Sequence, residues 1–261
     1  MADAAFRPLQ SGLATERDPQ EFDLPLTHAT TTLLFDKIVA EKELRPALCP
    51  KFSESLLYFF VGRMAYRMLQ DAEPSFLLGH SPLVLILKPE AVGTPGHVFP
   101  FDTGGYPTFY QGVVRNEPRS DFELDDMATA RKLIAKYWRS PKAYFKLDPR
   151  QVKPLPKKNG SIHRSLYDAI LRGQGVDKGD DRRGTIEVSV TGPVAISSQN
   201  LAAMIVPDEY MEDGRFKPLA DSLVRDGVLI RTYDWYGGRP IEYLSELRKL
   251  SLKLMQRLGY Y

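Results

Sequence analysis

Short apolar runs constrain the fold of this chain more than any other feature. They are too short, and too rich in β-branched and aromatic residues, to be buried helices, so each predicts a buried strand. The clearest are SLLYFFVG (55–62), PLVLILK (82–88) and TIEVSV (185–190), and similar runs lie at 24–31, 201–207 and 227–235.

Other segments carry apolar residues at helical spacing. A helix is predicted to follow Thr31, which can cap it, and further helices are predicted over 125–139, over 161–172 and along the apolar stripe from 243 to 258. The segment 89–120 is rich in proline and glycine and predicts irregular loops.

Strands thus dominate both ends of the chain, and helices dominate its middle. This order predicts an α+β fold with a mixed, mainly antiparallel sheet and flanking helices. Residues 1–23 are polar and aperiodic and predict an extended N-terminal arm. Residues 24–261 are expected to form a single domain with a basic helical insertion at about 115–175.

Composition excludes several classes of protein. The 261 residues are 43% hydrophobic and 26% charged, as in an ordinary globular protein. No apolar run approaches the roughly 18 residues that span a bilayer, and the first residues do not resemble a secretory signal. The single cysteine, Cys49, cannot form an internal disulfide. We therefore expect a cytoplasmic protein without a membrane partner.

A basic segment lies within a chain whose net charge is only +2. Residues 131–172 contain 12 Lys and Arg but only two acidic residues, and aromatic residues are interleaved among the basic ones. Such mixtures suit single-stranded nucleic acid, whose bases stack while its phosphates pair with cations. The candidate contacts here are Lys136, Trp138 and Arg139. The alternative is that the aromatic residues belong to the core and the basic residues are simply solvated.

Common catalytic motifs are absent from the sequence. There is no phosphate-binding GxxxxGK[ST] loop, no GxGxxG after a strand, no HExxH and no GxSxG. The four histidines lie far apart, and none has metal-ligand spacing to a cysteine or to another histidine. We therefore expect no metal.

Three polar residues stand out in or beside predicted strands. His28 lies within LTHAT, Arg63 directly follows an aromatic strand, and Glu187 interrupts the β-branched residues of TIEVSV. Each alone has an ordinary structural explanation. Alternation in TIEVSV, for example, would allow Glu187 to face water.

The order of these features resembles the ADP-ribosyltransferase superfamily. LTHAT, then YFFVGRMAY, then RGTIEVSV followed by AAMIVP, is most similar to the DarT-type toxins, which ADP-ribosylate DNA. The resemblance covers three short segments within 24–206. It implies a split sheet and NAD as a consumed substrate. The sequence departs from the DarT pattern after Arg63, where Met64 and Ala65 replace Ser-Pro, so the shape of this turn and the substrate are in question.

The resemblance also implies roles for individual residues. His28 would hydrogen-bond a ribose hydroxyl of NAD, with Thr30 assisting. Tyr58 and Tyr66 would flank the nicotinamide ring. Arg63 would contact NAD and help to hold the target.

Glu187 would be the catalytic carboxylate, acting together with Arg63. A carboxylate stabilises the positive charge that develops on the ribose as the nicotinamide bond breaks. An arginine can bind two pyrophosphate oxygens at once. Arg182 and Arg183, in the loop before Glu187, occupy the place where this superfamily recognises its acceptor.

The sequence therefore predicts an NAD-dependent ADP-ribosyltransferase, a bacterial toxin or defence effector that modifies DNA or RNA and has a neutralising antitoxin protein as partner. Three alternatives remain open. The acceptor could be a protein side chain, the chain could bind nucleic acid without catalysis, or it could be a metal-dependent nuclease that uses His97, Asp102 and Glu187.

Overall fold

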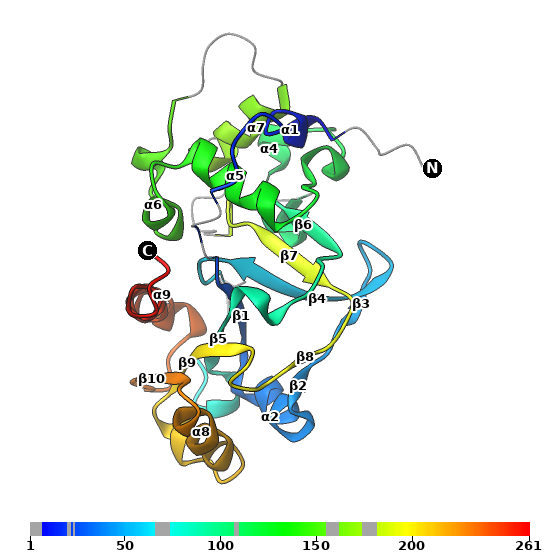
Figure 1. The fold of residues 1–261 in the computed structure, drawn as a ribbon. Helices are drawn as coiled ribbons and strands as arrows, with labels where there is room; N and C mark the ends of the chain where they lie inside the picture. Colours follow the sequence, from blue (N-terminus) through cyan, green and yellow to red (C-terminus); the bar gives the residue numbers. More distant parts are fainter. Residues whose placement is uncertain are drawn as a thin grey trace. The chain divides into compact units, whose positions relative to one another are not determined.

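The computed structural model describes residues 7–19, 22, 24–65, 74–106, 110–154, 162–173 and 182–261 (Figure 1). The chain divides into two compact units, each built from two stretches of sequence. We name them the helical unit (1–23 with 94–189) and the sheet unit (24–93 with 190–261). The predicted single domain with an insertion at 115–175 thus differs from the observed division, in which the helical unit already begins at Thr94 and extends to Ser189.

The sheet unit contains most of the predicted strands. Its main sheet has the order β10-β9-β5-β1-β4, and β3 also pairs with β4; of these strand pairs only β9 and β10 run parallel. The strands are β1 (Leu26–Thr31), β3 (Ala47–Cys49), β4 (Glu54–Val61), β5 (Pro82–Leu87), β9 (Leu201–Pro207) and β10 (Leu229–Tyr233). Separately, β2 (Glu43–Leu44) pairs with β8 (Val194–Ala195). The α+β fold with a mixed, mostly antiparallel sheet is therefore confirmed.

Two central strands explain the continuous apolar runs in the sequence. Every residue of β5 and of β9 is buried, because both strands are covered on both faces. Helix α9 (Pro240–Arg257) packs against β5, β9 and β10, and helix α2 (Thr32–Glu41) packs against β1 and β5. Thr31 caps α2 by accepting a hydrogen bond from the Leu34 amide at 3.4 Å, as the sequence predicts.

The helices of this unit are α2 (Thr32–Glu41), α8 (Phe216–Arg225) and α9 (Pro240–Arg257), with short 3₁₀ turns η1 (Leu78–His80), η2 (Pro89–Ala91) and η6 (Glu209–Glu212).

The helical unit packs short helices around an aromatic core. Phe101, Phe122, Tyr144 and Tyr167 are among its fully buried side chains. Among the described residues of this unit, β6 (His97–Phe99) pairs with β7 (Glu187–Val190) antiparallel, with Phe99 opposite Glu187. Its elements are α1 (Pro8–Ser11), β6 (His97–Phe99), η3 (Thr103–Gly105), α4 (Gln111–Val114), η4 (Arg119–Phe122), α5 (Met127–Tyr137), α6 (Pro141–Phe145), η5 (Pro149–Gln151), α7 (Ile162–Leu171) and β7 (Glu187–Val190). The predicted loop over 89–120 therefore contains a short strand and several single helical turns.

The N-terminal segment, residues 7–19, is not the extended arm that its polar composition predicts. Pro8–Ser11 form α1, and Leu9 and Leu13 are buried. Helix α1 packs against η4 and lies beside α7 (Figure 1). Burial of these two leucines helps to hold the segment against the rest of the unit.

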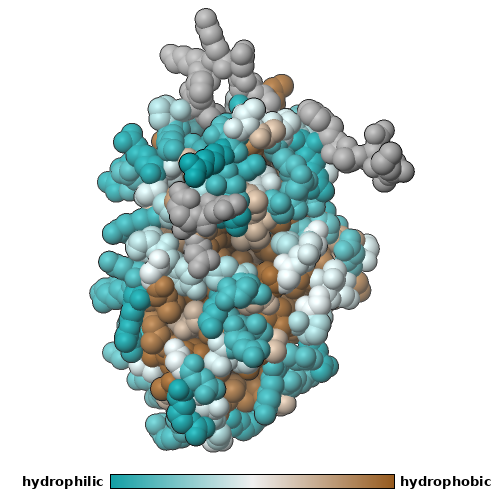
Figure 2. All heavy atoms as spheres, viewed as in Figure 1, coloured by the Kyte–Doolittle hydropathy of each residue, from teal (hydrophilic) through white to brown (hydrophobic). Residues whose placement is uncertain are grey.

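Exposed apolar side chains lie mostly on the sheet unit, and Figure 2 shows brown, apolar surface among polar residues on one face of the molecule. The exposed large apolar residues of the sheet unit include Leu33, Leu34, Leu48, Phe76 and Tyr236. None of the helices in the described part of the chain has the length and apolarity needed to cross a bilayer.

Candidate functional site

Glu187 is buried in the helical unit. It begins β7, and its side chain is only 4% exposed, because this strand is covered on both faces. The carboxylate accepts two hydrogen bonds from one residue: Thr103 Oγ1 donates to Oε1 at 2.5 Å, and the Thr103 amide donates to Oε2 at 3.3 Å. The alternative in which Glu187 faces water is therefore wrong.

A second buried carboxylate, Asp102, accompanies Glu187. Asp102 caps η3 by accepting a hydrogen bond from the Gly105 amide at 2.8 Å, and it forms an ion pair with Arg182, whose Nη1 lies 3.0 Å from Asp102 Oδ2. Both partners of this ion pair are almost completely buried. We name Asp102 and Glu187 the buried carboxylate pair. The sequence pointed to Asp102 only as part of a nuclease site, since nothing local connects it to a residue so distant in the chain.

The surroundings of Glu187 favour its protonated form. Burial raises the pKa of Glu187 well above its ordinary value, and the charge of Asp102 raises that pKa further. The hydrogen bonds from Thr103 act in the opposite direction without reversing the shift. A buried carboxyl with a displaced pKa next to a second carboxylate is typical of acid–base sites.

His28 lies in β1 of the sheet unit, just beyond the last residue at which β1 pairs with β4. Strand β1 pairs with β5 up to Thr31, but it pairs with β4 only at Leu26 and Thr27. Beyond Thr27 the two strands separate, and His28 Nδ1 lies 2.9 Å from the carbonyl oxygen of Tyr58.

This contact determines which nitrogen of His28 carries hydrogen. Burial lowers the pKa of His28 below its ordinary value, and the Tyr58 carbonyl only partly offsets this, so the imidazole is neutral at pH 7. A carbonyl can only accept, so Nδ1 must donate, and Nε2 is left as an unprotonated acceptor. Among the described residues, Nε2 has no hydrogen-bond partner.

The strand register places the predicted NAD-binding residues on different faces of the sheet. Alternation places Thr30 on the same face of β1 as His28. Thr27 stands opposite Phe60, so the side chains of Phe60 and Tyr58 lie on the other face. Tyr58 therefore presents its carbonyl, and not its ring, to His28. Tyr66, the other predicted aromatic contact, lies outside the described residues.

Arg63 is held in the turn that follows β4. Gly62 has a positive φ of 66°, which favours glycine, and its amide donates to the Pro25 carbonyl at 2.7 Å. The Arg63 carbonyl accepts from Thr27 Oγ1 at 2.8 Å, which joins the turn to β1. The turn therefore has defined anchors although Met64 and Ala65 replace Ser-Pro; both of these residues are buried.

His28, Thr30 and the Arg63 turn belong to the sheet unit, whereas Glu187 belongs to the helical unit. The convergence of Glu187 with His28 and Arg63 stays a prediction. Within the helical unit, His97 Nδ1 lies 2.7 Å from Glu123 Oε1, whereas the carboxylate pair is held by Thr103 and Arg182.

Several predicted acceptor contacts need correction. Trp138 is 2% exposed and its ring meets Tyr144 edge-on, so it belongs to the core and cannot stack on a base. Arg182 is buried in an ion pair with Asp102 and is not exposed to a nucleic acid. Arg183 is half-buried beside Gly173, and only Arg139 is exposed.

Two acidic residues of the N-terminal segment neutralise part of the basic helical surface. Asp18 accepts two hydrogen bonds from Arg131, at 2.6 and 2.8 Å, and Glu16 pairs with Lys136. Lys136 Nζ also donates to the Gly12 carbonyl at 3.1 Å. The predicted contact Lys136 is therefore already engaged by a segment that the sequence treats as a separate arm.

Comparison of the chain with protein-family models, with curated proteins and with solved structures finds no match.

Proposed function

We propose that this protein is an NAD-dependent ADP-ribosyltransferase that modifies nucleic acid and releases nicotinamide. The observation that carries the proposal is the buried carboxyl of Glu187, oriented by two hydrogen bonds from Thr103 and next to Asp102. In this reaction the bond between the ribose C1′ and the nicotinamide nitrogen breaks, and an acceptor atom bonds to C1′ and gives up a proton. An ionised Glu187 would stabilise the charge on the ribose and then take that proton.

The geometry around His28 supports NAD binding in the sheet unit. Its Nε2 is an unprotonated acceptor at the point where β1 and β4 separate, and a ribose hydroxyl is a matching donor. The hydrogen bond to the Tyr58 carbonyl fixes the ring, so no entropy is lost in orienting it when ribose binds. Arg63 is buried in the turn that Thr27 anchors, and binding of the pyrophosphate through its guanidinium belongs to the same proposal.

The rate of transfer should depend on pH through Glu187. Because its pKa lies above the ordinary 4.5, the active carboxylate is lost on acidification earlier than for a solvated glutamate. Asp102→Asn removes the neighbouring negative charge, lowers the pKa of Glu187 and should move the acidic limb of the pH–rate profile to lower pH. Rates of nicotinamide release between pH 4 and 9 would check this. Identical acidic limbs in both proteins would contradict the role of the pair.

Nucleic-acid binding should strengthen when the N-terminal segment loses the negative charges of Glu16 and Asp18. Glu16→Gln with Asp18→Asn removes the acidic partners of Lys136 and Arg131, so phosphates can compete for both cations. The slope of log K against log salt for single-stranded DNA should steepen by up to about 1.4, or 0.7 for each new contact. Fluorescence anisotropy across a salt series measures this slope. The matched control, Glu209→Gln with Asp226→Asn, makes the same change in charge at exposed positions of the sheet unit. Equal slopes in both double variants would argue against a nucleic-acid surface here.

A direct test of the function follows a label from NAD. The protein is incubated with NAD labelled in its adenylate part and with separate pools of single-stranded DNA, RNA and protein. We expect the label on nucleic acid, with nicotinamide released in equal amount. Label on protein alone would overturn the acceptor class, and the absence of any nicotinamide release would overturn the activity. A toxin or defence role, with an antitoxin as partner, belongs to the same proposal.

A further inference from the structure

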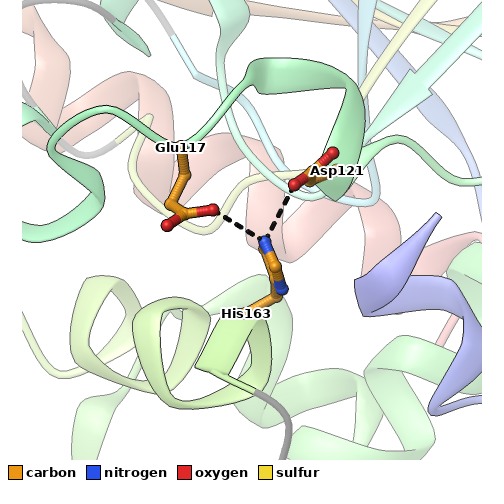
Figure 3. Close-up of side chains that lie close together, drawn as sticks. All are labelled: Glu117, Asp121 and His163. Carbon is orange, nitrogen blue, oxygen red and sulfur yellow. Dashed lines mark hydrogen bonds and ion pairs between the residues drawn. The ribbon is translucent and has the colours of Figure 1, made fainter.

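Three potential metal ligands meet in the helical unit, in a cluster that the proposed reaction does not use (Figure 3). Glu117 follows α4, Asp121 lies in η4, and His163 is the second residue of α7. His163 Nε2 lies 3.1 Å from Glu117 Oε2 and 3.0 Å from Asp121 Oδ2, and Figure 3 shows both carboxylates directed at this one nitrogen. The three ligand atoms all lie within 4.8 Å of one another.

His163 cannot satisfy both carboxylates of this cluster, either by hydrogen bonding or by charge. One imidazole nitrogen carries at most one hydrogen, so it cannot donate a good hydrogen bond to two carboxylates at once. Even a protonated imidazole leaves one net negative charge. Within the described residues, neither carboxylate has another side-chain partner, and the side chains are only 38%, 23% and 14% exposed for Glu117, Asp121 and His163.

The two carboxylates make this a partly buried cluster of negative charge, which a bound cation would stabilise.

The distances are close to those of a metal centre. Imidazole nitrogen and carboxylate oxygen both bind Zn²⁺ at about 2.0–2.2 Å, so two such ligands at the tetrahedral angle lie about 3.4 Å apart. The observed separations of 3.0 and 3.1 Å are a few tenths of an ångström shorter, so small side-chain movements would admit the ion. One nitrogen and two oxygens suit a first-row divalent cation better than Mg²⁺ or Ca²⁺, which prefer oxygen alone.

We propose that Glu117, Asp121 and His163 bind one first-row divalent cation such as Zn²⁺. The cation would link the beginning of α7 to Glu117, which follows α4, and to Asp121 in η4. The edge of the His163 ring packs against Phe122 at 5.5 Å between centroids, and this contact fixes the ring in the ligating orientation. The ligands are separated by 46 and 42 residues along the chain, which explains why sequence spacing predicts no metal. The site is independent of the proposed NAD chemistry.

Metal binding can be measured directly on the full chain. Metal-free protein is titrated with Co²⁺ and followed by its visible d–d absorption, and Zn²⁺ then displaces the Co²⁺. We expect one equivalent to bind, without the charge-transfer band of a thiolate ligand. Binding of Mg²⁺ or Ca²⁺ with no binding of Zn²⁺ would overturn the proposal.

Two variants and two controls assign the site. Asp121→Asn keeps an oxygen that can accept from His163 but removes the charge, and His163→Gln removes the nitrogen ligand; each should weaken Zn²⁺ binding at least about tenfold. His80→Gln and Cys49→Ser, both in the sheet unit, should bind Zn²⁺ as the parent does. Zn²⁺ should also raise the melting temperature of the parent and of both controls, but not that of Asp121→Asn. Unchanged affinity in Asp121→Asn and His163→Gln, or loss of binding in either control, would overturn the assignment.

Discussion

Glu187→Gln is expected to lower the rate of ADP-ribose transfer by about 10²–10³ at pH values where the Glu187 carboxyl of the parent is ionised. The amide oxygen can still accept a hydrogen bond from Thr103, so the buried side chain keeps a partner, but the amide cannot ionise. What is lost is the negative charge that would stabilise the developing positive charge on the ribose. The measurement is nicotinamide release from NAD under conditions in which the parent is saturated.

A matched control distinguishes catalysis from a general loss of charge. Glu246→Gln removes a glutamate from an exposed position of α9 and should retain the full rate. Binding of NAD should change little in Glu187→Gln, because the proposed contribution acts in the transition state. If Glu187→Gln transfers ADP-ribose as fast as Glu246→Gln, Glu187 is not the catalytic carboxylate.

Arg182→Met is expected to lower the free energy of unfolding by about 3–5 kcal/mol. The substitution leaves Asp102 as a buried carboxylate without its guanidinium partner, beside a second buried carboxyl group. The cost arises from the unpaired charge more than from the lost attraction, because an ion removed from water needs compensation inside the protein. Urea unfolding followed by circular dichroism measures the change.

The double variant Arg182→Met with Asp102→Asn tests this explanation. Removing both charges should restore much of the lost stability, since the Asn oxygen can still accept from the Gly105 amide. Arg183→Met is the control, because this half-buried neighbour forms no ion pair in the described structure. A double variant as unstable as Arg182→Met would show that the buried charge of Asp102 is not the cause.

The strands were predictable because their signals are local. The runs at 82–88 and 201–207 are continuously apolar, and both became central strands that are buried on both faces. Thr31 likewise predicted the start of α2, since a cap depends only on a residue and the amides that follow it.

The environments of the charged residues were not predictable in this way. Trp138 lies among basic residues in the sequence, yet it is buried, and Lys136 pairs with Glu16 from a segment expected to be a separate arm. Charge patterns describe composition along the chain, whereas ion pairs depend on which distant segments pack together. The same reason applies to Arg182, whose partner Asp102 lies on another element.

The sequence by itself determined the central strands, the longer helices, the α+β class and the three polar residues in or beside strands, because periodicity and capping act over a few neighbouring residues. Only the tertiary structure decided that Glu187 is buried beside Asp102, that Arg182 neutralises Asp102, and that Glu117, Asp121 and His163 meet at one point. These contacts join residues that are far apart in the chain, and packing alone selects them.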